Sequence, residues 1–146
     1  QKGNATHLLR SLFRSGSNKA EQQDAMNLLE LLQLSGKANN LASSLSYGDA
    51  RRLEIARALA GRPRLLLLDE PAAGMNESET EQLITDIQQI RQQVDAILLV
   101  EHDMNLIRKL SDRLVAMDYG KKIAEGTPGE VLSHPEVLKA YLGSDE

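Results

Sequence analysis

The chain has 146 residues, of which 41% are hydrophobic and 3% aromatic, with no cysteine and a formal net charge of -4. This length suffices for one domain with its own core, and the lack of cysteine excludes disulfides and thiolate metal sites. The scarcity of aromatic rings and the acidic balance argue against nucleic-acid binding. The apolar runs are too short to span a membrane, and no signal peptide is visible. Because the first residue is Gln rather than Met, we expect a truncated or processed start.

The first 44 residues are predicted to contain helices only, and therefore to form a separate helical lobe. Apolar residues at helical spacing predict a short amphipathic helix at 8–13 and a longer helix at 19–34, which Ser35 and Gly36 end. Residues 1–20 carry four basic side chains and no acidic one: Lys2, Arg10, Arg14 and Lys19. These side chains indicate either a solvated helix face or a surface near anionic lipid or a partner.

The remainder of the chain alternates predicted strands with predicted helices, which indicates an α/β fold with parallel strand pairing. Ser46 is expected to cap a helix that ends near Gly61, with Asp49 three residues on, as in a capping box. The continuous apolar run at 65–68 predicts a strand buried on both faces of a sheet. The other expected elements are a helix capped by Asn76 with Glu79 and running to about 93, a second buried strand at 96–100, a helix at 104–110, strands at 113–117 and 121–124 joined by a turn at 118–120, a helix capped by Thr127 with Glu130, and a last helix at 135–142.

Two carboxylates end the first predicted strand. Asp69 and Glu70 would lie at the carboxyl edge of the sheet, where ligands of open α/β sheets bind. Because adjacent strand residues point to opposite faces, the two carboxylates are expected to have different tasks. One could hold a metal ion, directly or through water, and the other could orient a nucleophilic water. This is the Walker B pattern of nucleotide hydrolases, although a strand can also end in polar residues without any such role.

A histidine follows the second predicted strand. The segment 101–103 has the sequence Glu-His-Asp, so His102 is expected at the same sheet edge. A single histidine at a strand end is often a satisfied structural group, but its place one strand along from the paired carboxylates favours a functional one. A metal site is a weak interpretation, because His7 and His134 have no ligand-like spacing to His102.

The helix that Ser46 begins is the third feature. The free amide groups and the dipole at its N-terminus suit an anion, Gly48 allows close backbone approach, and Ser46 offers a hydroxyl group. The simpler interpretation is that Ser46 is only an N-cap.

In combination and in this order, the three features resemble the ABC ATPase family. The segment 45–49 is Leu-Ser-Tyr-Gly-Asp, which is similar to the family signature Leu-Ser-Gly-Gly-Gln, with Tyr47 and Asp49 as departures. The segment 71–76, Pro-Ala-Ala-Gly-Met-Asn, resembles the D-loop, and His102 matches the switch histidine. The resemblance covers nearly the whole chain. It implies a partial P-loop NTPase core with parallel strands and a helical lobe at the N-terminus.

The resemblance also implies a division of the chain. Residues 1–61 would belong to the helical subdomain with the signature motif and its helix. Residues 62–146 would be the C-terminal part of the ATPase core. The exact residues of the motifs narrow the resemblance further. The chain looks most like the branched-chain amino acid importer ATPases. The urea/amide importers share most of these motifs, and the lipopolysaccharide-export ATPase is similar more distantly. These motifs are Ser-Tyr-Gly at 46–48, Arg-Arg-Leu-Glu-Ile-Ala-Arg at 51–57, Pro-Ala-Ala-Gly at 71–74, Glu-His-Asp-Met at 101–104, and a tail from Gly-Thr-Pro at 126–128 to Ala-Tyr-Leu-Gly at 140–143.

Roles for single residues follow from the resemblance alone. Asp69 would hold Mg²⁺ through water, Glu70 would be the catalytic carboxylate, and His102 would contact the γ-phosphate. ATP held mainly by a second subunit would be bound by the signature and D-loop residues, which are Ser46, Tyr47, Gly48, Asp49, Gly74 and Asn76. Because Asp49 replaces the amide usual at its place, it brings negative charge near phosphate, and we expect that Asp49→Gln would not weaken ATP-driven dimer closure.

The implied function is ATP hydrolysis that drives import of branched-chain amino acids or of a related small solute such as urea or an amide. The implied partners are a second ATPase subunit, integral-membrane permease subunits and, indirectly, a solute-binding protein, with no nucleic acid. The implied location is cytoplasmic, peripheral on the inner face of the cell membrane.

The phosphate-binding loop of the family, Gly-x-x-x-x-Gly-Lys-[Ser/Thr], does not occur in the sequence, and Gly36-Lys37-Ala38 is the nearest approach to it. Both ATP and Mg²⁺ are therefore expected to need a missing N-terminal half, and the isolated chain is expected to be inactive. Missing strands would leave apolar surface open, so we expect association with itself or with another chain. Two alternatives stay open: a soluble ABC-type ATPase of DNA repair or chromosome maintenance, and a non-catalytic assembly fragment.

Overall fold

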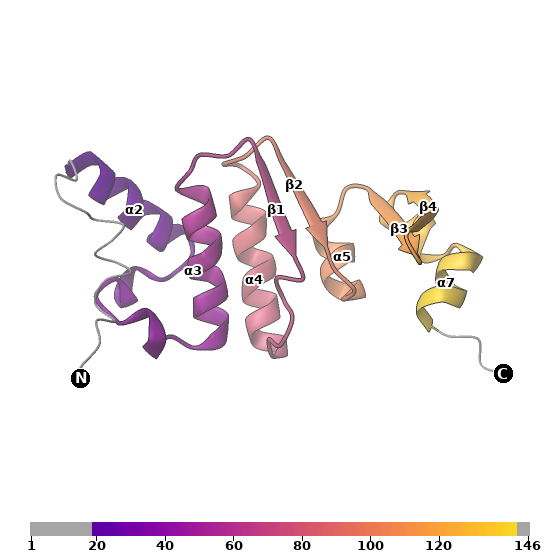
Figure 1. Cartoon of the computed structure of the whole chain (residues 1–146), viewed down its shortest axis with the longest axis horizontal. Helices are drawn as coiled ribbons and strands as arrows, with labels where there is room; N and C mark the ends of the chain where they lie inside the picture. Colours follow the sequence, from indigo (N-terminus) through magenta and orange to yellow (C-terminus); the bar gives the residue numbers. More distant parts are fainter. Residues whose placement is uncertain (1–18, 143–146) are drawn as a thin grey trace. The chain divides into compact units, whose positions relative to one another are not determined.

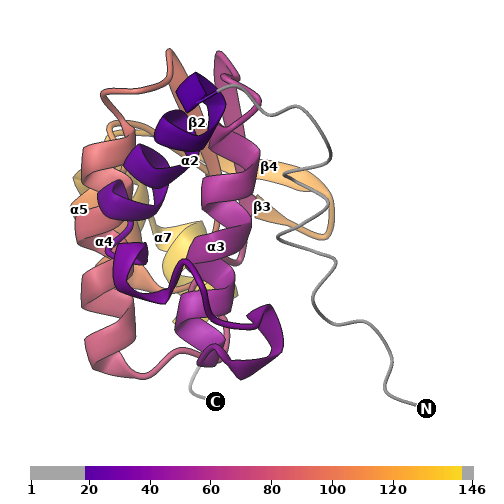
Figure 2. The ribbon, with the colours of Figure 1, turned by 90° about the vertical axis from the view of Figure 1, so that its left-hand side faces the viewer.

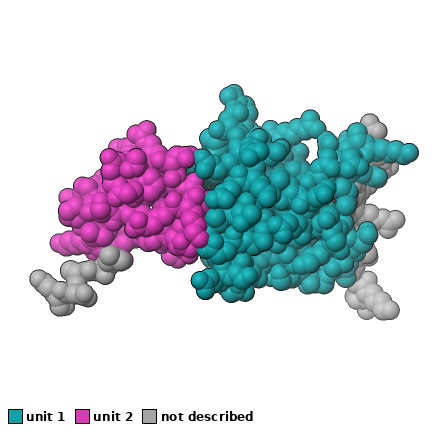
Figure 3. Space-filling view, turned by 180° about the vertical axis from the view of Figure 1, so that it is seen from behind, with its two compact units in different colours: residues 1–100 teal, residues 101–146 magenta. Residues whose placement is uncertain are grey.

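The computed structural model describes residues 19–142 and is shown in Figure 1. The predicted helix at 8–13 and the basic residues Lys2, Arg10 and Arg14 lie outside the described residues. The chain divides into two compact units, residues 1–100 and residues 101–146 (Figure 3). The division between residues 61 and 62 that the resemblance implies stays a prediction.

The first unit contains a parallel two-stranded sheet. Strand β1 (Leu65–Asp69) pairs with strand β2 (Ala96–Val100), in a register that runs from Leu65 opposite Ala96 to Asp69 opposite Val100. Helix α4 (Glu77–Ile90) connects the two strands, and Figure 1 shows them side by side. The predicted parallel pairing is confirmed for these two strands, whereas the third strand of the predicted alternation, Leu114–Asp118, pairs antiparallel with the strand that follows it. The pairing of β1 with β2 brings the last residues of both strands to one edge of the sheet.

Only one face of this sheet is buried. Leu66 and Leu68 are 3% and 8% exposed, whereas Leu65 and Leu67 are 51% and 65% exposed. In β2 the outward residues Leu98 and Val100 are also more than half exposed, at 57% and 54%. The prediction of strands buried on both faces is therefore wrong for this structure. The physical reason is that helices of this unit cover a single face, while the opposite apolar face has no covering layer among the described residues.

Two helices and the segment after a third supply the rest of this core. Helix α3 (Tyr47–Leu59) and α4 contribute buried apolar residues, and helix α2 (Lys19–Leu31) packs against both of them (Figure 2). The helix predicted at 19–34 ends earlier, because Gln33 adopts a positive φ of 56°. Two short 3-10 turns, η1 (Ser35–Lys37) and η2 (Ala42–Ser44), lie between α2 and α3. The buried apolar residues of the unit are Leu32, Leu34, Ile55, Ala56, Leu59, Leu66, Leu68, Leu83, Ile84, Ile87 and Ile90.

The second unit begins with helix α5 (Met104–Leu110). Strands β3 (Leu114–Asp118) and β4 (Lys121–Gly126) form the predicted hairpin, which is antiparallel, and Gly120 in its turn has a φ of 76°. Helices α6 (Pro128–Leu132) and α7 (Pro135–Leu142) follow, and Thr127 and Glu130 form the predicted capping box. Ala116, Val131 and Val137 make a small buried cluster of this unit. None of the helices in the described part of the chain combines the length and the apolar character that crossing a membrane requires.

Candidate nucleotide-binding site

Helix α3 begins with a side-chain cap. The hydroxyl oxygen of Ser46 accepts a hydrogen bond from the Asp49 amide at 3.2 Å, and the Ser46 carbonyl accepts one from the Ala50 amide at 2.9 Å. The capping box expected here is only half formed, because the Asp49 side chain does not return to the cap and instead contacts two basic groups. Ser46 and Tyr47 are exposed, whereas Gly48 and Asp49 are buried.

Tyr47 contacts Arg51, the residue one helical turn further along α3. Its ring is about half exposed, the Arg51 guanidinium carbon lies 5.6 Å from the ring centroid, and Arg51 Nε donates a hydrogen bond to the Tyr47 hydroxyl at 3.3 Å. A cation over an aromatic face is attracted by the ring quadrupole. Arg51 Nη1 also donates to Glu54 Oε2 at 3.0 Å, so the guanidinium group is held between Tyr47 and Glu54 along α3.

The start of α3 lies against the segment that precedes α4. A Cβ placed on Gly74 would lie 3.4 Å from Tyr47 Cε1, and a Cβ placed on Gly48 would lie 2.9 Å from Glu79 Oε1. Gly74 has a φ of 78°, a conformation that side-chain-bearing residues rarely adopt. The signature segment and the D-loop segment of this chain are thus packed together through two glycines.

The segment before α4 is itself fixed by a capping box. Asn76 Oδ1 accepts from the Glu79 amide at 3.0 Å, and Glu79 Oε2 accepts from the Asn76 amide at 3.1 Å. The box was expected from the sequence, and it satisfies two of the amide groups that a helix start leaves without partners. Glu79 has two tasks, since it caps α4 and lies over Gly48.

Asp69 and Glu70 lie at the carboxyl end of β1, and both side chains are exposed. Asp69 is the last paired residue, opposite Val100, and the Glu70 amide donates to the Val100 carbonyl at 2.8 Å. Glu70 has a φ of 42°, which is uncommon for a residue with a side chain, and its carbonyl accepts from the Ala73 amide at 3.1 Å. The chain therefore turns sharply at Glu70, so the two carboxylates do not continue the alternation of the strand.

His102 is exposed and belongs to the second unit. It follows Val100 by two residues in the chain, and its amide donates to Glu101 Oε2 at 3.2 Å. Asp103 caps α5, because its Oδ1 accepts from the amides of Asn105 and Leu106 at 2.8 and 3.0 Å. The structure thus brings the signature and D-loop segments together, places Asp69 next to Glu70, and groups His102 with the other unit.

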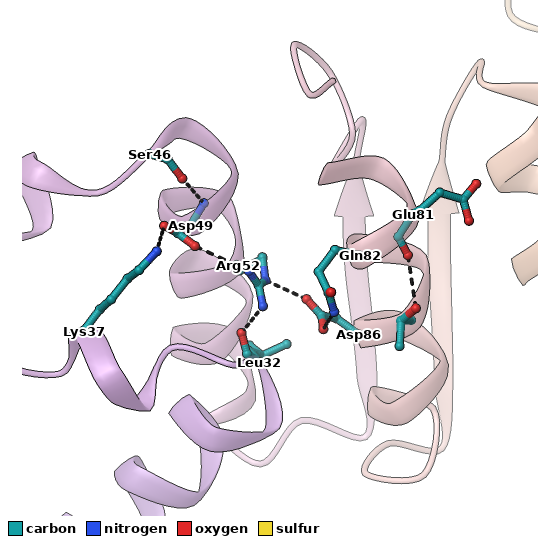
Figure 4. A network of polar contacts seen from close by, with 9 residues as sticks. Leu32, Lys37, Ser46, Asp49, Arg52, Glu81, Gln82 and Asp86 are labelled. Atoms are coloured by element: carbon teal, nitrogen blue, oxygen red, sulfur yellow. Dashed lines mark hydrogen bonds and ion pairs between the residues drawn. The ribbon is translucent and has the colours of Figure 1, made fainter. Parts of the chain in front are cut away.

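Sequence reasoning missed a buried network of charges behind the start of α3, shown in Figure 4. Asp49 pairs with Lys37 and with Arg52, and Arg52 pairs in turn with Asp86, which has no exposed surface. Burial raises the pKa of Asp49, but hydrogen bonds with Lys37 and Ser46 and the charges of Lys37 and Arg52 outweigh it, so its pKa lies below the ordinary value. A signal was available in the sequence, because Asp86 interrupts the apolar face of a helix next to Ile87.

The described residues contain no cluster of three or more His, Cys, Asp or Glu side chains that could hold a metal ion by themselves. Magnesium in nucleotide-binding sites takes one or two carboxylates and completes its shell with phosphate and water. A single exposed Asp69 at a strand end fits that donor set. The exposed Ser46 hydroxyl and the helix start fit a phosphate oxygen.

Comparisons with known proteins agree with this geometry. A family model described as "ABC transporter" matches residues 2–73, and a model described as "Branched-chain amino acid ATP-binding cassette transporter" matches residues 121–146. The chain is 43% identical over 143 residues to the high-affinity branched-chain amino acid transport ATP-binding protein BraF of Pseudomonas aeruginosa, and equally to LivG of Escherichia coli. Each alignment covers 94% of this chain and 56% of the relative, so the chain spans little more than half the length of these proteins.

Solved structures give the same result. The ADP conformation of MJ1267, an ATP-binding cassette of an ABC transporter, matches with a TM-score of 0.80 at 30% identity, over 94% of this chain and 57% of that one. A nucleotide-free ATP-binding cassette from an ABC transporter matches with a TM-score of 0.78 at 29% identity, with the same coverage. The fold is therefore that of the ABC ATPase cassettes. By sequence and by fold, the chain belongs to the ABC transporter ATP-binding family.

Proposed function

We propose that this chain is part of the ATP-hydrolysing subunit of an ABC importer for branched-chain amino acids or a related small solute such as urea or an amide. The observation that carries this proposal is the 43% identity to BraF and LivG over 143 residues. The separate match of residues 121–146 to a family model for branched-chain amino acid cassettes supports it. The first alternative, an ATPase of DNA repair or chromosome maintenance, gains no support from these relatives, which are named as transport proteins.

The residues proposed to take part in catalysis are Asp69 and Glu70 at the end of β1 and, in the second unit, His102. Magnesium-ATP supplies the phosphoryl group that water attacks. Asp69 would hold the metal ion through a water molecule, and Glu70 would orient or deprotonate the attacking water. His102 would contact the γ-phosphate. The exposure of both carboxylates at the end of β1 leaves each of them open to a ligand, and their separate tasks rest on the family resemblance.

The start of α3 is proposed to bind ATP held mainly by a second ATPase subunit. Ser46 would donate its hydroxyl group, and the backbone at Tyr47 and Gly48 would approach the phosphate. Gly74 and Asn76 of the D-loop would lie beside this contact, which the packing of Gly74 on Tyr47 supports. A contact of this kind stabilises the closed pair of subunits only while the γ-phosphate is present.

The proposed partners are a second ATPase subunit, integral-membrane permease subunits and, indirectly, a solute-binding protein. The subunit would lie on the inner face of the cell membrane through its contact with the permeases. This part of the proposal rests on the likeness to named transport proteins.

We also propose that the chain alone does not hydrolyse ATP, since it contains no Gly-x-x-x-x-Gly-Lys-[Ser/Thr] segment. Calorimetry with Mg-ATP tests this directly. The chain alone should give no binding heat. After mixing with the portion of BraF that this chain does not match, supplied as a separate polypeptide, binding should appear. Tight binding by the chain alone would show that it builds a phosphate site from other residues.

The solute class is tested with a BraF chimera, in which this chain replaces the 56% of BraF that it matches. In cells that lack BraF, the chimera should restore leucine uptake. The matched control is the same replacement in the Fe(3+) import protein FbpC of Streptomyces avermitilis, which is 38% identical to this chain, and it should not restore iron uptake. Restored iron uptake without leucine uptake would contradict the proposed solute class.

A further inference from the structure

Asp49 departs from the amide expected at its place, and its carboxylate is turned into the protein (Figure 4). The side chain is 9% exposed. Oδ2 accepts a hydrogen bond from Lys37 Nζ, and Oδ1 lies 3.4 Å from Arg52 Nη1. Both oxygens are therefore paired with cations from the protein itself, and the negative charge of Asp49 is neutralised locally.

Arg52 connects this carboxylate to two other elements. Its Nε donates to Asp86 Oδ2 on α4 at 2.7 Å, and its Nη2 donates to the Leu32 carbonyl just after α2. Asp86 also accepts from Gln82 Nε2 at 3.1 Å. Because Asp86 is fully buried and Arg52 is its cationic partner, the loss of Arg52 would leave an uncompensated charge in the interior. The guanidinium group thus ties α3 to the end of α2 and to α4.

The Asp49 backbone belongs to the cap of α3. Its amide donates to the Ser46 hydroxyl oxygen, and the next amide, that of Ala50, donates to the Ser46 carbonyl. A side chain held from behind by Lys37 and Arg52 therefore fixes the residue whose amide orients Ser46. Gly48, the neighbour of Asp49, is fixed from the other side by Glu79.

We infer that Asp49 is a positioning residue, which together with Arg52 holds the start of α3 against α2 and α4, and that its carboxylate does not contact nucleotide. The inference rests on the proposed function only for what the start of α3 presents to a ligand. It explains how a carboxylate is tolerated at a place next to phosphate, where an unpaired negative charge would be repelled.

Site-resolved hydrogen exchange on the full chain tests the inference without nucleotide. The variant is Arg52→Met, and the matched control is Arg51→Met, which removes an exposed arginine one residue away that contacts Tyr47 and Glu54. In Arg52→Met the amides of Asp49 and Ala50 should lose protection by about tenfold or more, while the Ala60 amide at the far end of α3 changes by less than about twofold. Arg51→Met should leave all three within about twofold.

Arg52→Met leaves two carboxylates without their arginine, so the chain can fail to fold. Asp49→Asn provides the second test, because it keeps the shape and removes the charge. It should lower the protection of the Asp49 and Ala50 amides selectively. Arg52→Lys keeps the charge but cannot reach three acceptors at once, so the protection of these amides should lie between that of Arg52→Met and that of the wild type.

Two results overturn the inference: wild-type protection of these amides in Asp49→Asn, or an equal loss at all amides of α3, which a purely structural role gives. These outcomes are distinct from failure of the proposed function. A BraF chimera that does not hydrolyse ATP would contradict the proposed function and would leave the exchange result unchanged.

Discussion

At the scale of single residues, Gly48 of the signature segment has no room for a side chain. From the sequence we expected its lack of a side chain to serve close approach to phosphate. The structure adds an internal reason, because the Glu79 carboxylate occupies the space that a Cβ would need. Spacing along the chain predicts Glu79 as the capping partner of Asn76, but its contact with Gly48 could not be derived, since the two residues lie on different helices.

Gly48→Ala should therefore leave the chain less stable than the same change at a helix position with open space around the new Cβ. The new methyl group would displace the Glu79 carboxylate from the Asn76 amide, and loss of a helix cap costs about 1 kcal/mol. Gly129→Ala is the matched control, because Gly129 is also the second residue of a capped helix but has nothing within 4 Å of its Cβ position. Urea unfolding measures both. Equal stability changes in the two variants would refute the contact. So would a Glu79→Ala change that lowers the stability of Gly48→Ala and of Gly129→Ala by the same amount.

The Asp49 carboxylate predicts an acid-sensitive stability. Its pKa is lowered in the folded chain from an ordinary value of 3.8, so its stabilisation is present above that value and is lost as pH falls through the folded pKa. The free energy of unfolding should therefore fall below pH of about 4 and fall less steeply in Asp49→Asn. Glu130→Gln is the control, since its pKa is also lowered, but by Thr127 on an exposed surface, where such effects are small. An unchanged slope in Asp49→Asn would contradict the buried pairing.

At the scale of elements, capping residues and apolar runs located most of the helices and strands. Ser46, Asn76 and Thr127 each cap a helix as expected, because a cap is a local interaction within one turn. The ends of α2 and α4 were placed too far along the chain, at 34 and 93 rather than at Leu31 and Ile90. The main error was the prediction that both strands are buried on both faces. Burial of a strand depends on what covers each face of the sheet and not on the strand's own residues.

The one-sided sheet makes neighbouring leucines unequal. Leu66→Ala should cost about 2–5 kcal/mol of unfolding free energy, because Leu66 is 3% exposed. Leu67→Ser should cost far less unfolding free energy, because Leu67 is 65% exposed. The double variant with Leu67→Ser and Leu98→Ser should bind less of an apolar dye and self-associate less than the wild type. Leu67 and Leu98 are register partners on the open face. A large loss of stability in Leu67→Ser, measured by urea unfolding, would mean that this face is covered in solution.

At the scale of the whole molecule, the order of motifs identified the family, and the fold agrees with it. The signature segment and the D-loop segment were expected near the same ligand, and they are packed together in one unit. His102 lies in the other unit, so its role stays a prediction. The place of Asp86 on an apolar helix face indicates a buried carboxylate, but its partner Arg52 could not be derived, because residues 34 positions apart meet only through the packing of α3 on α4.

The most direct measurement is ATP hydrolysis by the purified BraF chimera with Glu70 intact and with Glu70→Gln. Loss of a general base lowers the rate by about 10²–10⁴-fold, and we expect a loss in this range. Glu77→Gln, which changes an exposed carboxylate in the first turn of α4, is the control and should keep the rate of the unaltered chimera. An equal rate in Glu70→Gln would contradict the account, because the end of β1 would then have no part in the chemistry.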